Sequence, residues 1–107
     1  MDPKAFQILV SLAAAPMHGY AIRQEVEART EGEVRLWPAT LYGTLSELTS
    51  TGLIEETASP GGVGDDPRRK YYALTGEGRR VLWGEAARLE RLARLARTHL
   101  SLGGAVA

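Results

Sequence analysis

The chain has 107 residues, 44% hydrophobic and 24% charged, and its 13 basic side chains balance 13 acidic ones, which is typical of one soluble globular domain. No apolar run approaches the roughly 20 residues that cross a bilayer, and the N-terminus lacks the pattern of a secretory signal, so we expect a cytoplasmic protein. The lack of cysteine excludes disulfides, thiol catalysis and zinc sites on sulfur, and with only two distant histidines, His18 and His99, we expect no metal and no cofactor.

The N-terminal part of the sequence predicts two amphipathic helices. Asp2 before a proline is a typical helix start, and apolar residues then recur at helical spacing over residues 3–14, until Pro16 ends the pattern. After a turn at residues 17–19, a second helix is predicted to run to about Arg29.

A third helix is predicted after a connector at residues 30–37, from Pro38 as a first helical residue to Gly52 as a left-handed cap. Its buried face carries three leucines at steps of four and three, namely Leu41, Leu45 and Leu48. Its outward face and flanks carry mostly small or hydroxyl-bearing side chains, namely Ala39, Thr40, Tyr42, Gly43, Thr44, Ser46, Glu47 and Ser50. Short side chains let a helix axis approach another surface closely, and the major groove of DNA is one such surface.

From residue 53 onward the pattern changes from helical to extended. Short strands are predicted at residues 53–57 and 68–74, and the proline- and glycine-rich residues 59–67 between them indicate the long, mobile tip of a hairpin.

Three adjacent cations at the base of this hairpin form the strongest local electrostatic feature: Arg68, Arg69 and Lys70. Extended backbone sends alternate side chains to opposite faces, so either Arg68 with Lys70, or Arg69 alone, would reach a duplex. The alternative hypothesis is a solvated strand end, whose cations balance Asp65 and Asp66.

A last helix, which Thr75 can cap and no proline interrupts, is predicted over about residues 76–100. Its apolar residues alternate in steps of four and three, as in a coiled coil, and Leu92 and Leu95 widen the stripe of Leu82, Ala86, Leu89, Ala93, Ala96 and Leu100. A helix of this length extends past the core of so small a domain, so we expect the stripe to pack against a partner chain. Residues 103–107 are predicted to form a disordered tail.

The order helix, helix, helix, hairpin, long helix predicts a mainly α fold with a small β-hairpin, an α+β winged helix-turn-helix. Four segments resemble the PadR family of bacterial transcriptional regulators: His18-Gly19-Tyr20-Ala21-Ile22, Pro38-Ala39-Thr40-Leu41-Tyr42 with Leu45 and Leu48, Gly52-Leu53-Ile54, and Arg68-Arg69-Lys70-Tyr71-Tyr72-Ala73-Leu74-Thr75-Gly76-Glu77-Gly78. The resemblance implies a winged helix domain over residues 1–75 and a homodimer formed largely through one C-terminal helix over residues 76–102, as in the short-tailed branch of the family. It also implies repression at a palindromic operator.

The candidate DNA-binding residues are Tyr20, Ala39, Thr40, Tyr42, Gly43, Thr44, Ser46, Arg68, Arg69 and Lys70, and the candidate dimer-interface residues are Leu82, Ala86, Leu89, Leu92, Ala93, Ala96 and Leu100. Tyr20 either touches a phosphate or packs the first two helices together. Trp37 is expected in the core or against the third helix, with a place near DNA as the alternative. Trp83 is expected to pack against the first helix. The alternative for Trp83, which the resemblance to multidrug-sensing PadR-like proteins implies, is a contact with a planar aromatic effector.

The charge distribution limits how such a protein could bind DNA. Residues 1–75 hold 7 basic and 10 acidic side chains, a net charge of −3, whereas residues 76–107 hold 6 and 3, a net charge of +3. Ser46 and Glu47 stand where many family members have Lys or Arg, although the Glu47 carboxylate can accept a hydrogen bond from cytosine. We therefore expect few phosphate contacts and a shallow salt dependence. The competing hypothesis is a winged helix used only for protein association. The sequence shows no carboxylate pair or nucleophile-base pair, so we do not expect an enzyme.

Overall fold

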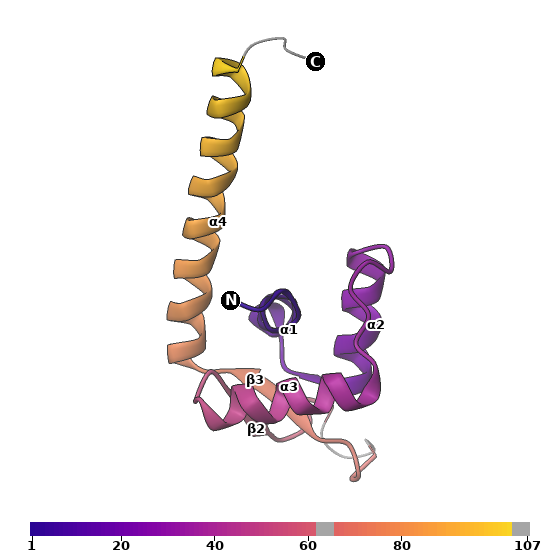
Figure 1. Ribbon diagram of the computed structural model, residues 1–107. Coiled ribbons are helices and arrows are strands. Elements are labelled where there is room, and N and C mark those ends of the chain that lie inside the picture. Colours follow the sequence, from indigo (N-terminus) through magenta and orange to yellow (C-terminus); the bar gives the residue numbers. More distant parts are fainter. Residues whose placement is uncertain (62–65, 104–107) are drawn as a thin grey trace.

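The computed structural model describes residues 1–61 and 66–103, and in this part of the chain four helices and three strands follow one another (Figure 1). They are α1 (Pro3–Ala14), β1 (Met17–His18), α2 (Gly19–Arg29), α3 (Pro38–Ser50), β2 (Ile54–Thr57), β3 (Tyr71–Leu74) and α4 (Gly76–Leu102). The predicted order of helices and hairpin is confirmed, and the first two helices end where the sequence indicated. Within the predicted hairpin tip and tail, residues 62–65 and 104–107 lie outside the described residues.

Side chains at the helix ends satisfy backbone groups that have no partner within the helix. The carboxylate of Asp2 accepts from the amide of Lys4 at 2.8 Å, and His18 Nδ1 accepts from the amide of Ala21 at 3.2 Å. Gly52 follows the end of α3 with a φ of 78°, a left-handed conformation that glycine adopts without strain. The predicted caps at Asp2 and Gly52 are therefore confirmed, and His18 caps a helix.

The sheet contains a strand that the sequence did not indicate. Its order is β1-β3-β2, all antiparallel, with Met17 opposite Tyr72 and Ile54 opposite Leu74. The prediction of a turn at residues 17–19 was therefore incomplete, because Met17 and His18 pair with β3 before α2 begins. A two-residue strand has too short a pattern to be recognised in a sequence, and it forms here because β3 presents a free edge.

The predicted strand at residues 68–74 was too long, because β3 begins only at Tyr71. Asp66 holds the preceding residues in a turn: its carboxylate accepts from the amide of Arg68 at 2.9 Å, and its carbonyl accepts from the amide of Arg69 at 3.1 Å. Aspartate before proline favours such turns. The three cations therefore precede the strand, and the alternation of an extended chain does not govern the direction of their side chains.

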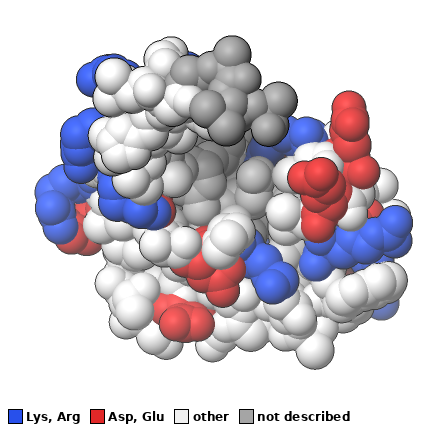
Figure 2. All heavy atoms as spheres, turned by 45° about the horizontal axis from the view of Figure 1, so that its top comes forward, with Lys and Arg blue, Asp and Glu red and all other residues white. Residues whose placement is uncertain are grey.

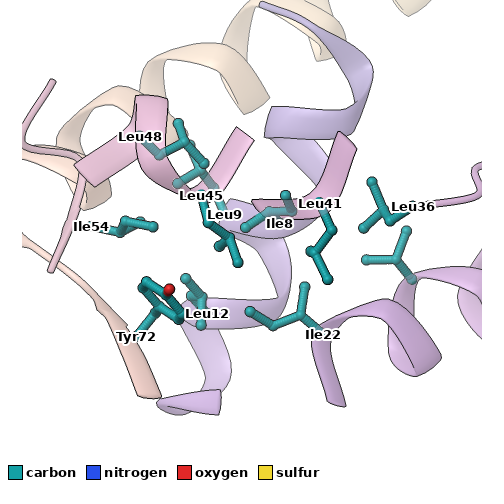
Figure 3. Close-up of a cluster of buried hydrophobic side chains, with 11 residues drawn as sticks. Ile8, Leu9, Leu12, Ile22, Leu36, Leu41, Leu45, Leu48, Ile54 and Tyr72 are labelled. Carbon is teal, nitrogen blue, oxygen red and sulfur yellow. The ribbon is translucent and has the colours of Figure 1, made fainter. Parts of the chain in front are cut away.

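The core lies where α1, α2 and α3 meet the sheet, and Figure 3 shows its side chains pointing toward one another. It consists of Ile8, Leu9, Leu12, Ile22, Val26, Leu36, Leu41, Leu45, Leu48, Ile54 and Tyr72. The predicted inward face of α3 is thus confirmed. Arg29 joins α2 to α1 at the edge of this core, since its guanidinium donates to the Gln7 side chain, the Gln7 carbonyl and the Ser11 hydroxyl at 2.9–3.1 Å.

The start of α4 is anchored to the chain around Leu53, residues 82–86 border a hollow that α1 also lines, and the later turns of the helix extend away from the domain (Figure 1). The Thr75 hydroxyl donates to the Gly52 carbonyl at 2.7 Å and accepts from the amide of Gly78 at 3.0 Å. Gly78 is the one buried residue that the described part of α4 contains. Among the described residues no helix combines the length and apolar character needed to cross a membrane.

The positions of both tryptophans correct the sequence-based expectations. Trp37 is 56% exposed, so its expected place in the core was wrong. It directly precedes α3, the Arg23 guanidinium lies over its ring at 5.6 Å, and Leu36 occupies the core in its place. Trp83 is 78% exposed, so its expected packing against α1 was also wrong. Trp83 only borders the hollow between α1 and α4.

Candidate nucleic-acid interface

A hollow of about 720 Å³ lies between the start of α2, one flank of α3 and the base of the hairpin. Its lining comprises His18, Gly19, Tyr20, Tyr42, Ser46, Thr49, Ser50, Glu56, Arg68, Arg69, Lys70 and Tyr72. Six predicted DNA-binding residues meet here, namely Tyr20, Tyr42, Ser46, Arg68, Arg69 and Lys70. The other four, Ala39, Thr40, Gly43 and Thr44, belong to α3 but do not line the hollow.

The outward face of α3 is open to solvent. Three leucines bury the opposite face, and the small residues Ala39, Gly43 and Ser46 are exposed. Thr40 and Thr44 are half-buried, and the Thr44 hydroxyl donates to the Thr40 carbonyl at 2.8 Å. Because the Thr44 hydroxyl proton is donated within the helix, the Thr44 oxygen can only accept a hydrogen bond from a bound molecule. This part of the helix can therefore approach a surface closely and accept hydrogen bonds there.

Tyr42 is held at the wall of the hollow by its contact with Gly19. A Cβ added to Gly19 would lie 3.0 Å from the Tyr42 hydroxyl oxygen and 3.1 Å from its ring, so the absence of a side chain lets the ring lie against the start of α2. Tyr42 is 53% exposed and Tyr20 is 57% exposed. Of the two hypotheses for Tyr20, this exposure favours contact with a ligand over packing between α1 and α2.

The cations of the hollow have acidic neighbours. Arg68 Nε lies 3.2 Å from Asp66 Oδ1, and Lys70 Nζ lies 3.4 Å from Glu56 Oε1. Arg68, Arg69 and Lys70 are nevertheless exposed. The alternative hypothesis of cations balanced by local acids is thus partly correct for Asp66, whereas Asp65 lies outside the described residues. On the face shown in Figure 2, basic and acidic side chains lie among one another.

Six residues of the lining were not among the predicted DNA-binding residues, namely His18, Gly19, Thr49, Ser50, Glu56 and Tyr72. Tyr72 is buried at the hollow, where burial first and the Glu56 charge second raise the pKa of its phenol. Glu56 could have been found from the sequence, because alternation in the predicted first strand places Glu55 and Glu56 on opposite faces, and one of those faces meets the cationic end of the second strand. Among the described residues, no three histidine or acidic side chains gather to hold a metal ion.

The predicted dimer-interface residues form an apolar stripe along α4. Leu82 and Ala86 border a second, apolar hollow of about 310 Å³, which Phe6, Val10 and Ala13 of α1 also line. Farther along α4, five stripe residues are exposed, namely Leu89, Leu92, Ala93, Ala96 and Leu100. The exposed fraction rises from 38% at Leu89 to 73% at Leu100. The described part of the chain therefore leaves most of this stripe in contact with solvent.

Comparison with solved structures finds this arrangement in transcription regulators. A PadR family transcription regulator from Clostridium difficile is 27% identical, with a TM-score of 0.75 over 91% of this chain and 97% of the other. A PadR-like transcription factor from Bacteroides fragilis is 28% identical, with a TM-score of 0.68 over 88% and 86% of the two chains. These similarities confirm the α+β winged-helix fold with its C-terminal helix.

Sequence comparison adds relatives and a family model. A 37.1 kDa protein in transposon TN4556 of Streptomyces fradiae is 36% identical over 85 residues, and protein X of Lysinibacillus sphaericus is 38% identical over 65 residues. The matches cover 79% and 61% of this chain but 22% and 58% of those proteins. The model of the transcriptional regulator PadR-like family, whose members are regulators and not enzymes, matches residues 8–83. With both its sequence and its fold matched across most of its length, the chain belongs to the PadR-like family of transcriptional regulators.

Proposed function

We propose that this chain is a sequence-specific regulator that binds double-stranded DNA as a homodimer, at a palindromic operator in the cytoplasm. The observation that carries this proposal is the exposed, small-side-chain face of α3 next to a hollow that contains three cations. In winged helix-turn-helix proteins the corresponding helix enters the major groove. We assign residues 1–75 to DNA binding and residues 76–102 to dimerisation.

The proposed contacts follow from the chemistry of each side chain. Ala39 and Gly43 let the α3 backbone approach the groove. The hydroxyls of Thr40 and Ser46 hydrogen bond to base edges or phosphates, and the Thr44 oxygen accepts from a base amino group. Backbone phosphates are contacted by the tyrosines and cations of the hollow, namely Tyr20, Tyr42, Arg68, Arg69 and Lys70. Because residues 1–75 have a net negative charge, phosphate binding would depend on these few side chains and not on a broad positive surface.

Dimerisation through the α4 stripe supplies the second half of the site. The exposed leucines of this stripe lie at coiled-coil spacing, and burial of such a stripe drives helix association. Two recognition helices related by a two-fold axis read two half-sites about 34 Å apart on one side of B-DNA. A dimer that covers a palindrome in a promoter blocks transcription, so we assign a repressor role.

The experiment that tests this function measures binding to a duplex from the chain's own promoter region. The wild type is expected to bind, and the Arg68→Ala/Arg69→Ala variant is expected to lose about 100-fold in affinity, because a dimer then lacks four phosphate-neutralising charges. The matched control is Arg91→Ala/Arg94→Ala, which removes as many charges from exposed positions of α4. Equal losses in the two variants would show that the hollow is not the phosphate-binding site.

A winged helix used only for protein association remains the second candidate function. The acidic neighbours of Arg68 and Lys70 and the lack of cations on α3 favour it. The same binding experiment separates the two functions, because an association module leaves the mobility of every promoter fragment unchanged.

We further propose that a small aromatic effector binds this protein and releases it from its operator. Trp83 is 78% exposed beside the apolar hollow between α1 and α4, and its indole offers a flat surface on which a planar compound can stack. In a Trp37→Phe background, proflavine is expected to quench Trp83 fluorescence to saturation, with a Kd in the micromolar range, roughly −8 kcal/mol. Cyclohexylamine, which cannot stack, is the control compound. Equal, unsaturable quenching by both would remove the effector from the proposal.

A further inference from the structure

Glu56 places a negative charge inside the hollow where DNA phosphates are proposed to bind. In the sheet, Glu56 pairs with Tyr72 and its neighbour Glu55 pairs with Ala73. Successive side chains of a strand point to opposite faces. Glu56 accordingly lines the hollow together with the three cations, and Glu55 does not.

The partner of this carboxylate is one of the cations assigned to DNA binding. Lys70 Nζ lies 3.4 Å from Glu56 Oε1, and the two side chains are 71% and 56% exposed. An exposed pair of this kind adds little to stability. The pair nevertheless limits phosphate binding by Lys70. When the Lys70 ammonium turns to a phosphate it must leave the Glu56 carboxylate, and the negative charge of Glu56 then remains beside that phosphate.

We infer that Glu56 competes with DNA phosphates for Lys70 and thereby sets the strength and salt dependence of duplex binding. The inference rests on the proposed function and deepens it by naming the residue that limits the phosphate contacts. Binding that does not depend on sequence consists almost entirely of phosphate neutralisation. The Glu56 charge therefore weakens the phosphate neutralisation that would otherwise hold the protein on a duplex of any sequence.

The test compares Glu56→Gln with Glu55→Gln on a duplex of random sequence. Both variants remove one carboxylate, on adjacent residues of β2, so they change the net charge equally. Glu56→Gln is expected to bind three- to tenfold more tightly, because Lys70 then contacts phosphate without competition. Its plot of log affinity against log salt is expected to steepen by up to about 1.8, which is about 0.9 per protomer if Glu56 fully occupies Lys70 in the wild type. Glu55→Gln is expected to change the affinity by less than about twofold, because its charge is exposed and screened.

A Lys70→Gln background shows whether the effect passes through the lysine. There the steeper salt dependence of Glu56→Gln is expected to disappear, since the contested cation is absent. The inference is overturned if Glu56→Gln and Glu55→Gln behave alike, if Glu56→Gln binds more weakly than wild type, or if the steepening persists without Lys70. If no form of the protein binds any duplex, the proposed function fails as well. Those two failures are therefore distinguishable.

Discussion

Gly78→Ala is expected to destabilise the protein by about 2–3 kcal/mol, the upper part of the range for overpacking. A Cβ at this position would lie 2.0 Å from the carbonyl oxygen of Leu53 and 2.7 Å from Cδ1 of Leu74. The first of these atoms belongs to the backbone and cannot rotate away. The methyl group therefore forces α4 away from the anchor that Thr75 makes with Gly52 and Leu53.

Thermal unfolding followed by circular dichroism measures this effect. For a domain of about 100 residues the loss corresponds to a fall in Tm of roughly 10–20 °C. Gly84→Ala is the matched control, because a Cβ at Gly84 meets nothing within 4 Å. Replacing a glycine by alanine in an exposed helix is expected to stabilise it by about 0.5–1 kcal/mol. Opposite signs for the two substitutions are the expected result, and a Tm of Gly78→Ala equal to that of wild type contradicts the anchor.

Leu89→Glu is expected to convert the proposed dimer into a monomer. Leu89 lies in the middle of the α4 stripe and is 38% exposed in the single chain. A carboxylate there would be buried without a partner in an apolar interface, at a cost of several kcal/mol for each protomer. Light scattering is expected to give the mass of one 11.6 kDa chain in place of two. Operator affinity is expected to fall by about 100-fold or more, because the second half-site is no longer bound at high effective concentration.

Ala87→Glu controls for the added charge on the same helix. Residue 87 is exposed, and at about 100° per residue it lies on the side of α4 opposite the stripe. This variant is expected to remain a dimer and to bind the operator. A wild type that is already a monomer at micromolar concentration would contradict the proposed dimer, and dissociation of both variants would show that the interface is not confined to the stripe.

The helices could be predicted because their signals are local. The period of Leu41, Leu45 and Leu48, the cap at Asp2 and the glycine at Gly52 each act within a few residues. The fold class followed from the order of these elements. The stripe of α4 was equally visible in the sequence, because a coiled-coil pattern does not depend on the rest of the chain.

The errors concern features that depend on distant contacts. Whether Met17 pairs with Tyr72 is decided by β3, more than fifty residues away, and no pattern in two residues can indicate it. Whether Leu36 or Trp37 enters the core depends on the direction in which the connector reaches α3. The start of β3 was misplaced for a local reason that was overlooked, namely the turn that the Asp66 carboxylate makes with Arg68.

The candidate DNA-binding surface was predicted in its parts but not as a unit. The sequence indicated Tyr42, Ser46 and the three cations separately, whereas their gathering around one hollow depends on how α3 packs beside the hairpin. Strand alternation in the sequence places either Glu55 or Glu56 beside the cations, but it does not say which of the two. The structure decides between them, because it places Glu56 at 3.4 Å from Lys70.

α4 is attached to the rest of the chain only along its first turns, where Gly78 is buried, Leu82 packs against the core and Glu85 pairs with the N-terminal amine. Its 27 residues extend about 40 Å at 1.5 Å per residue, and among the described residues of the helix only Gly78 is buried by the rest of the chain. A rotation of roughly 10° about the attached part near Leu82 would displace the far end, about 30 Å away, by about 5 Å, which is about a seventh of one turn of B-DNA. In the proposed dimer, small changes in side-chain volume around residue 78 would thus change the half-site separations that two chains span, with no change in any residue proposed to contact a base.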